Sequence, residues 1–473
     1  MSLLNAINAN GENVDLSDEV FNGFKMNFRG DLIQPTDDDY EERRSLWNGM
    51  IDKKPCLIAK CSGTADVISA VKFARKHDLL TTVRGGGHHV AGKATCDNGM
   101  VIDLSSMNSV HVDPEKSTAL VQGGATLGDV DHETSPFGLT TPLGVVSETG
   151  VAGLTMHGGY GWQTRKHGLS LDNVISAEVV TAKGELLRTS AEENPDLFWA
   201  IRGGGGSFGI VTSFEFQLYP MDPQAWLLLT IYPLSKAKEG FELMRDYFPD
   251  APEELGVIGL IWSAPDEDFI PDEYKGEPVF IFLGSYTGSV DEGEKVLKPF
   301  REMGTPVADV SEPMPFEFVQ KAIDADFPDG RNYYWKSAYV SELNDDLIDL
   351  MIKHGSDRPS PLTSIDVWAL GGKVNRVDSD STAFYQRNAP FMINYESNWD
   401  EPEANDENVE WTRKAYNEII EVVDVGSYMN FPGFGEEGKD FFSKSFGPNY
   451  ERLKEIKKKY DPDNFFQGFV SLE

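Results

Sequence analysis

Three glycine-rich segments in the first half of the chain constrain its fold more than any other feature of the sequence. They lie at residues 83–89, 149–162 and 202–211, and the third contains four consecutive glycines. Consecutive glycines let backbone N–H groups converge on an anion and let a phosphate approach the main chain closely. The first of them has neither the spacing of a GxGxxG fingerprint nor that of a Walker loop. A tight turn would explain any one of them, but three together favour a large cofactor that carries phosphate.

Strand and helix patterns alternate along the first part of the chain. They predict strands at 55–60, 79–83, 100–104, 118–122, 174–182, 185–189 and 210–219, and helices at 64–77 and 197–201. From about Met221 the pattern changes to amphipathic helices at 236–248, 291–303 and 344–354, with strand-like runs at 226–232, 279–286 and 365–370. A basic helix is predicted at 449–460. We therefore expect a mixed α+β protein with more than one domain.

Acidic residues are in large excess over basic ones. The sequence has 42 Lys and Arg against 77 Asp and Glu, a net charge of −35. Such a surface repels nucleic acid and anionic membranes, so we expect neither as a partner. The carboxylates are dispersed, which favours adaptation to a salty cytoplasm where salt screens the self-repulsion. An ordinary acidic enzyme is the alternative.

Cysteine usage and the lack of long apolar runs indicate the compartment. Cys56, Cys61 and Cys96 fit a reducing environment better than a disulfide scaffold, and no Cys/His cluster has the spacing of a metal site. The sequence shows no signal-peptide pattern and no apolar run of membrane-spanning length. We expect a cytoplasmic protein without a bound metal.

A series of motifs in a fixed order links the glycine segments to the end of the chain. The order is Val83-Arg-Gly-Gly-Gly-His88, Gly123-Gly-Ala125, Thr149-Gly-Val-Ala-Gly-Leu-Thr155, Trp199-Ala-Ile-Arg-Gly-Gly-Gly-Gly-Ser-Phe-Gly-Ile-Val-Thr212 and Ser427-Tyr-Met-Asn430. It resembles the FAD-linked oxidases related to berberine bridge enzyme over nearly the whole chain. The resemblance implies a two-part FAD-binding domain of the vanillyl-alcohol oxidase type, formed by residues 1–220 and a returning segment 412–473. Residues 221–411 would form a substrate domain, an antiparallel sheet covered by helices, with the active site between the two parts.

The resemblance also implies roles for individual residues. His88 would bond covalently to the flavin 8α-methyl group, and Val146, where many relatives have a second linking cysteine, would leave that bond single. Tyr428 would contact the isoalloxazine ring and act as the catalytic base. The other residues implied in cofactor binding are Arg84, Gly85, Gly86, Gly87, His89, Thr149, Gly150, Gly153, Gly158, Gly159, Ile210, Val211 and Asn430.

Several residues keep a second interpretation, and one motif departs from the family. Without the family resemblance, His88 would be interpreted as an ordinary loop histidine and Tyr428 as a core aromatic residue. His157 is more simply explained by a hydrogen bond to a backbone carbonyl, and Asp366 by charge pairing on its strand. The family's terminal Asn-x-Asn is replaced by Phe469 and Ser471, so the C-terminal contacts are expected to differ.

The implied function is oxidation of a small organic substrate. We expect an alcohol or carbohydrate hydroxyl to lose hydride to covalently held FAD, with molecular oxygen as the acceptor that reoxidises the flavin. An oxidative tailoring enzyme or dehydrogenase, acting on a natural-product ring with another electron acceptor, is the alternative. A flavin-binding protein without turnover is a third possibility.

Overall fold

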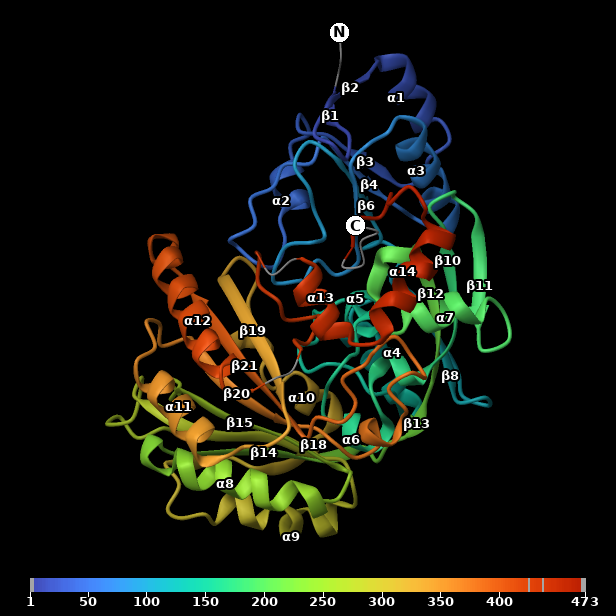
Figure 1. Cartoon of the computed structure of the whole chain (residues 1–473). Helices are drawn as coiled ribbons and strands as arrows, with labels where there is room; N and C mark the ends of the chain where they lie inside the picture. Colours follow the sequence, from blue (N-terminus) through green and yellow to red (C-terminus); the bar gives the residue numbers. More distant parts are fainter. Residues whose placement is uncertain (1–3, 424–425, 436–437, 469–473) are drawn as a thin grey trace.

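The structure, a computed structural model, describes residues 4–423, 426–435 and 438–468. Phe469 and Ser471 lie outside these ranges. The first part of the chain and the C-terminal helices form one side of the molecule, and a large sheet with its covering helices forms the other (Figure 1). None of the helices in the described ranges is long and apolar enough to cross a membrane.

A βαβ unit precedes the first glycine loop. Helix α3 connects two parallel strands and buries Val67, Val71 and Ala74, the face that the helical spacing predicted. The strand after it ends at Arg84, so the glycines at 85–87 and His88 lie at the carboxyl end of a parallel strand, where ligands commonly bind in such sheets. The elements here are β1 (Leu4–Ile7), β2 (Asn13–Leu16), α1 (Asp18–Lys25), β3 (Asp31–Ile33), α2 (Tyr40–Arg44), β4 (Leu57–Lys60), α3 (Thr64–Lys76), β5 (Thr81–Arg84) and β6 (Met100–Asp103), with sheet order β3-β4-β6-β5.

A second sheet of five antiparallel strands carries the other two glycine segments. Its order is β11-β10-β12-β8-β7. The elements are β7 (Val110–Asp113), β8 (Thr118–Gln122), α4 (Leu127–Thr134), β9 (Leu139–Thr140), α5 (Val151–Met156), α6 (Thr164–His167), β10 (Val174–Val180), β11 (Leu186–Ser190), α7 (Pro195–Ile201), β12 (Ile210–Gln217) and β13 (Tyr219–Pro220).

The C-terminal helices α13 (Lys439–Phe446) and α14 (Asn449–Tyr460) return to this second sheet. Leu453, Ile456 and Tyr460 share a hydrophobic core with the residues of α7. The buried Lys457 ammonium donates to Ser207 O at 2.8 Å, Phe466 O at 2.7 Å and Asp461 at 2.6 Å. The end of the described chain is thereby fixed to the loop with four glycines.

The large sheet has eight antiparallel strands and is covered by helices on one face (Figure 1). The order is β17-β14-β16-β15-β20-β21-β19, with β18 paired to β14. The strands are β14 (Gln224–Pro233), β15 (Leu255–Ser263), β16 (Pro278–Tyr286), β17 (Ala308–Asp309), β18 (Glu312–Pro315), β19 (Asn332–Val340), β20 (Ser364–Ala369) and β21 (Phe391–Trp399). The helices on that face are α8 (Ala237–Tyr247), α9 (Val290–Arg301), α11 (Asp345–Ser356) and α12 (Asn405–Ile420), whereas the short α10 (Phe316–Gln320) packs beside β14 at the edge of the other face. The α+β class and the antiparallel sheet covered by helices are confirmed.

Element boundaries differ from the predictions where local contacts intervene. The strand predicted from Leu79 begins at Thr81, because the Leu79 N–H still bonds to Ala74 O at the end of α3. The strand predicted at 210–219 is two strands, since β12 ends at Gln217 and β13 pairs with β9 instead. Strands β15, β19 and β21 escaped prediction because they are buried on both faces and show no alternation of polar and apolar residues.

Candidate active site

A cavity of about 310 Å³ lies between the glycine loops and the uncovered face of the large sheet. Side chains alternate along a strand, so one face of the sheet contributes every second residue of its strands. These residues, which we call the sheet wall, are Ile258, Leu260, Trp262, Leu283, Trp335, Ser364, Asp366, Trp368, Glu396 and Asn398. The opposite wall comes from the three glycine segments, the loop 144–146, and Phe466, Gln467 and Gly468.

The glycine loops present bare main chain to this cavity. A Cβ atom on Gly86 would lie 2.5 Å from Gly150 N, and one on Gly150 would lie 2.4 Å from Gly86 N. The first and second loops are therefore in direct backbone contact, which only glycine permits. A Cβ on Gly153 would meet nothing within 4 Å, and Gly206 has only Met156 Cε nearby at 3.9 Å. Both of these glycines line the cavity, so a side chain there would occupy its open space.

His88 lies on the cavity wall, and its buried Nε2 has no hydrogen-bond partner among the residues that the structure describes. Burial lowers the pKa of His88 to about 3, so the ring is neutral at physiological pH. A neutral imidazole keeps a nitrogen lone pair available for bonding. His89, beside it, accepts a hydrogen bond from Ala91 N on Nδ1 at 3.1 Å.

Most of the residues expected to bind the cofactor do line the cavity. They are Gly85, Gly86, Gly87, His88, His89, Thr149, Gly150, Gly153, Ile210, Val211, Tyr428 and Asn430. Val146 also lines it.

The structure does not bring Arg84, Gly158 or Gly159 to the cavity wall. On β5, Val83 faces the cavity and Arg84 the other side, where its guanidinium bonds to Asp103 at 2.6 Å. Gly158 and Gly159 lie against Tyr428: a Cβ on Gly158 would sit 3.0 Å from the tyrosine ring, and Gly159 N donates to its hydroxyl. Gly158 makes room for the Tyr428 ring and Gly159 holds its hydroxyl, and neither lines the cavity.

The Tyr428 hydroxyl oxygen accepts three hydrogen bonds. The donors are Gly159 N at 3.0 Å, Tyr160 N at 3.3 Å and Asn430 Nδ2 at 2.8 Å. Burial raises the pKa of Tyr428 above its usual value, and the three donors oppose that rise only in part. The tyrosine is thus held firmly at the cavity but kept protonated at neutral pH.

Two carboxyl groups meet on the sheet wall. Asp366 on β20 and Glu396 on β21 are diagonal neighbours, since Ser364 pairs with Glu396 in the strand register. Their side chains hydrogen-bond to each other, and both residues are about 5% exposed or less. Burial raises the pKa of Asp366 to about 7, and burial together with Asp366 raises the pKa of Glu396 well above its ordinary value. Two carboxyls this close cannot both ionise, so the pair holds a proton at neutral pH.

No lysine or arginine pairs with Asp366 among the described residues. Asn394 Nδ2 donates to Glu396 Oε1 at 2.5 Å, whereas Asp366 Oδ1 has no hydrogen-bond partner. Pairing of Asp366 with a cation, the alternative interpretation of its strand position, is therefore not what the structure shows. Its partner is a second acid.

Two family models match the chain. A model described as FAD binding domain matches residues 55–190, and one described as berberine and berberine like matches residues 427–469. The chain is also 31% identical over 460 residues to an FAD-linked oxidoreductase of Dictyostelium discoideum, covering 96% of this chain and 97% of the relative. The chain belongs to the berberine bridge enzyme-like FAD-linked oxidoreductases.

Other relatives of this FAD-linked oxidoreductase agree in sequence and in fold. (R)-6-hydroxynicotine oxidase of Paenarthrobacter nicotinovorans is 29% identical, with 95% of this chain and 97% of the relative aligned. The crystal structure of 6-hydroxy-D-nicotine oxidase from Arthrobacter nicotinovorans superimposes with a TM-score of 0.84 at 26% identity, covering 94% of this chain and 98% of the other. Physcomitrella patens BBE-like 1, at 22% identity, shares the fold with a TM-score of 0.86, covering 96% of this chain and 99% of the other.

The cavity of the oxidoreductase fits FAD, the cofactor of its family. The bare glycine main chain leaves room for a phosphate-bearing chain, and His88 on the cavity wall has a buried Nε2 without a hydrogen-bond partner among the described residues. FAD binding and oxidoreductase activity, both expected from the motifs, are confirmed by the family.

Several residues of the oxidoreductase's site were not identified from sequence. Glu396 lies in a fully buried strand, and its pairing with Asp366 depends on strand register, which no local pattern reveals. Trp47, which stacks on His88, comes from a loop without regular structure. His157 lines the cavity and its Nδ1 is 2.9 Å from Gly153 O, the backbone bond that its simpler interpretation predicts.

Proposed function

We propose that this oxidoreductase oxidises an alcohol or carbohydrate hydroxyl by hydride transfer to FAD that is bonded to His88. The observation that carries this proposal is the Asp366–Glu396 pair on the wall of the cavity that also contains His88. Hydride leaves an alcohol carbon readily only as the hydroxyl proton departs, so a proton acceptor must lie within hydrogen-bond reach. A carboxyl pair whose proton is lost near pH 7 is suited to that task.

When bound, FAD would supply the hydride acceptor and a route for the electrons to dioxygen, giving hydrogen peroxide. The protein's own residues position the substrate and take its proton. We assign proton uptake to the carboxyl pair and substrate orientation to Tyr428, because burial keeps the tyrosine protonated while the pair can ionise near neutral pH. The rate of flavin reduction should therefore rise as the pH passes through about 7.

The test is an anaerobic screen of donors that follows bleaching of the flavin spectrum, followed by admission of air. With a donor in hand, Asp366→Asn, which removes the carboxyl that ionises near pH 7, should slow flavin reduction by about 10²–10⁴-fold, the usual cost of losing a general base. The matched control is Glu418→Gln on α12, which removes a carboxylate that bonds to His354 rather than to any residue of the cavity. Equal reduction rates in the Asp366 variant and the control would reject the carboxyl pair as the base. Slow reoxidation in air would indicate a dehydrogenase with another acceptor.

A cationic amine is a second candidate donor, favoured because three carboxyl groups line the cavity against one lysine, Lys93. Asp326, whose pKa burial raises to about 6, joins Asp366 and Glu396 in lining it. The sheet wall, as described, has no lysine or arginine, and its Trp335 and Trp368 offer aromatic faces to a cation. Bleaching by amines but not by alcohols or sugars in the same screen would select this candidate.

The covalent bond has its own test. Acid precipitation of the purified protein should leave a yellow pellet, and a flavin peptide should contain His88. His88→Ala should release the flavin on denaturation while the glycine loops still bind it. A colourless pellet from the wild-type protein under a yellow supernatant would contradict covalent attachment.

A further inference from the structure

Three aromatic rings stack behind the cavity and end on His88. The His88 and Trp47 ring centroids are 4.0 Å apart with 17° between their planes. The Tyr333 ring stacks on Trp47 at 3.7 Å and 14°. The stack therefore runs from strand β19 of the large sheet, through a loop of the N-terminal part, to the histidine of the first glycine segment.

Trp47 is held in place independently of His88. Its indole Nε1 donates to Phe327 O at 2.8 Å, and its carbonyl accepts from Gly330 N at 2.8 Å. A Cβ on Gly49 would lie 2.2 Å from Gly330 O, so the two loops are in backbone contact. The indole, 3% exposed, is thus a fixed surface against which the imidazole rests.

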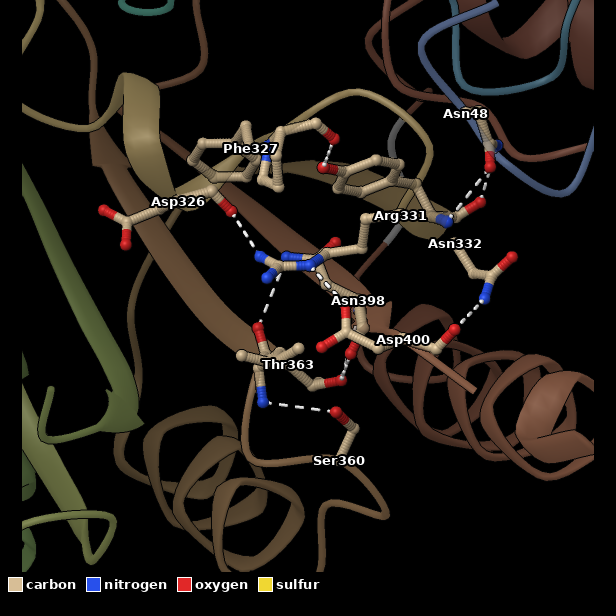
Figure 2. Close-up of polar contacts among 12 residues, drawn as sticks. Asn48, Asp326, Phe327, Arg331, Asn332, Ser360, Thr363, Asn398 and Asp400 are labelled. Atoms are coloured by element: carbon tan, nitrogen blue, oxygen red, sulfur yellow. Dashed lines mark hydrogen bonds and ion pairs between the residues drawn. The ribbon is translucent and has the colours of Figure 1, made fainter. Parts of the chain in front are cut away.

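Asn48, the residue after Trp47, hydrogen-bonds the Trp47 loop to the segment that follows His88 and to Tyr333. Its Nδ2 donates to Val90 O at 2.6 Å and to Tyr333 O at 2.9 Å, and its Oδ1 accepts from Tyr333 N at 3.1 Å. Figure 2 shows Asn48 at this junction, with Arg331 nearby bonding to the Asp326 carbonyl at 2.8 Å and to Asp400 at 2.9 Å. The loop that carries Asp326 and Phe327 to the cavity is therefore anchored to the segment that carries His88.

The imidazole of His88 needs such a support. The final torsion of a histidine side chain is intrinsically broad, and the hydrogen bond that the His88 ring makes is to its own backbone, while Nε2 has no partner among the described residues. Stacking on Trp47 restricts the ring plane and so determines where its nitrogens point. Aromatic pairs of this kind contribute a preference of about 2- to 12-fold in a rotamer equilibrium.

We propose that Trp47 is a positioning residue for the covalent attachment of FAD to His88, an inference that rests on the tether proposed above. Attachment breaks one C–H bond of the 8α-methyl group and the N–H bond of the imidazole, and forms one C–N bond. Two protons and two electrons are released. The electrons reduce the flavin ring, and dioxygen then removes them together with the protons as hydrogen peroxide. Trp47 takes no part in bond making; it holds the imidazole nitrogen toward the cavity.

The experiment compares Trp47→Leu and Trp47→Phe with the control Trp399→Leu. Trp399 is also a buried indole, 2% exposed, whose Nε1 bonds to Asn405 at 2.7 Å, and it is remote from His88 in sequence and absent from the cavity wall. Each protein is produced without flavin, mixed with FAD in air, and sampled over time. Total bound FAD and acid-stable FAD are measured separately.

Trp47→Leu should bind FAD but attach it about 2- to 12-fold more slowly than wild type, while Trp47→Phe, which keeps a stacking ring, should recover most of the rate. Trp399→Leu should attach FAD at the wild-type rate. Equal attachment rates in wild type and Trp47→Leu, or equal slowing in both leucine variants, would overturn the proposal. If Trp47→Leu does not fold, Tyr333→Leu, which removes the outer ring of the stack, is expected to slow attachment, and an unchanged rate there would overturn it. A wild-type protein with no acid-stable flavin would instead refute the tether itself.

Discussion

Replacement of Asp366 by asparagine should change how stability depends on pH. The pKa of this buried carboxyl is raised from 3.8 to about 7 by burial, so the folded protein favours its protonated form. The stability linked to that proton is fully present below the unfolded pKa and is lost as the pH rises through about 7. A shift of this size corresponds to on the order of 4 kcal/mol, at about 1.4 kcal/mol per pKa unit. Asparagine does not ionise, so the variant lacks this loss.

The assay is urea unfolding of the wild-type protein and Asp366→Asn at about pH 5 and about pH 8. The variant should gain about 2.6 kcal/mol relative to wild type between the two pH values, because pH 5 already lies above the unfolded pKa and only about two pKa units of the shift remain to be lost. Asp38→Asn, which removes an exposed carboxyl of the N-terminal part, is the control and should show no such gain. A stability difference between Asp366→Asn and wild type that is the same at both pH values would refute the protonated carboxyl pair.

Three further predictions follow from the same structure. Tyr428→Phe leaves three N–H donors without their acceptor and should destabilise the protein by about 1–3 kcal/mol, with flavin reduction within about tenfold of wild type; a loss of about 10²–10⁴-fold in stopped-flow reduction would return the base role to the tyrosine. Gly86→Ala places a Cβ 2.5 Å from Gly150 N and should lower the melting temperature, whereas Gly153→Ala meets only open space and should leave it unchanged while weakening FAD binding in a fluorescence titration. If the net charge of −35 is an adaptation to salt, the melting temperature should rise from low to molar KCl, and a flat or falling series would reject that reading.

The cavity wall formed by the glycine segments could be predicted because the sequence patterns that identify it are local. Each glycine segment is contiguous in sequence, and His88 follows one of them directly, so residue type and spacing were enough to locate both. Arg84 shows the limit of that reasoning: it belongs to the same motif, but strand alternation turns its side chain to Asp103.

The sheet wall could not be predicted in the same way. Asp366 and Glu396 are thirty residues apart and meet only because β20 and β21 pair in one register. A shift of that register by a single residue would turn one carboxyl to the helix-covered face. The stack of Tyr333, Trp47 and His88 likewise joins three distant segments, none of which carries a motif for the contact.

The position of Lys457 has a consequence for biosynthesis. Its ammonium joins the C-terminal helix to Ser207 O and Phe466 O, and the cavity wall runs from Thr81 to Gly468. A nascent chain that has emerged only as far as the large sheet has its glycine loops but lacks the segment that closes them. FAD can therefore be enclosed only after residue 468 has been synthesised and its segment has packed against the glycine loops. Until then the chain exposes the apolar surface of α7 that α14 will cover, and this is the interval in which a chaperone would be needed.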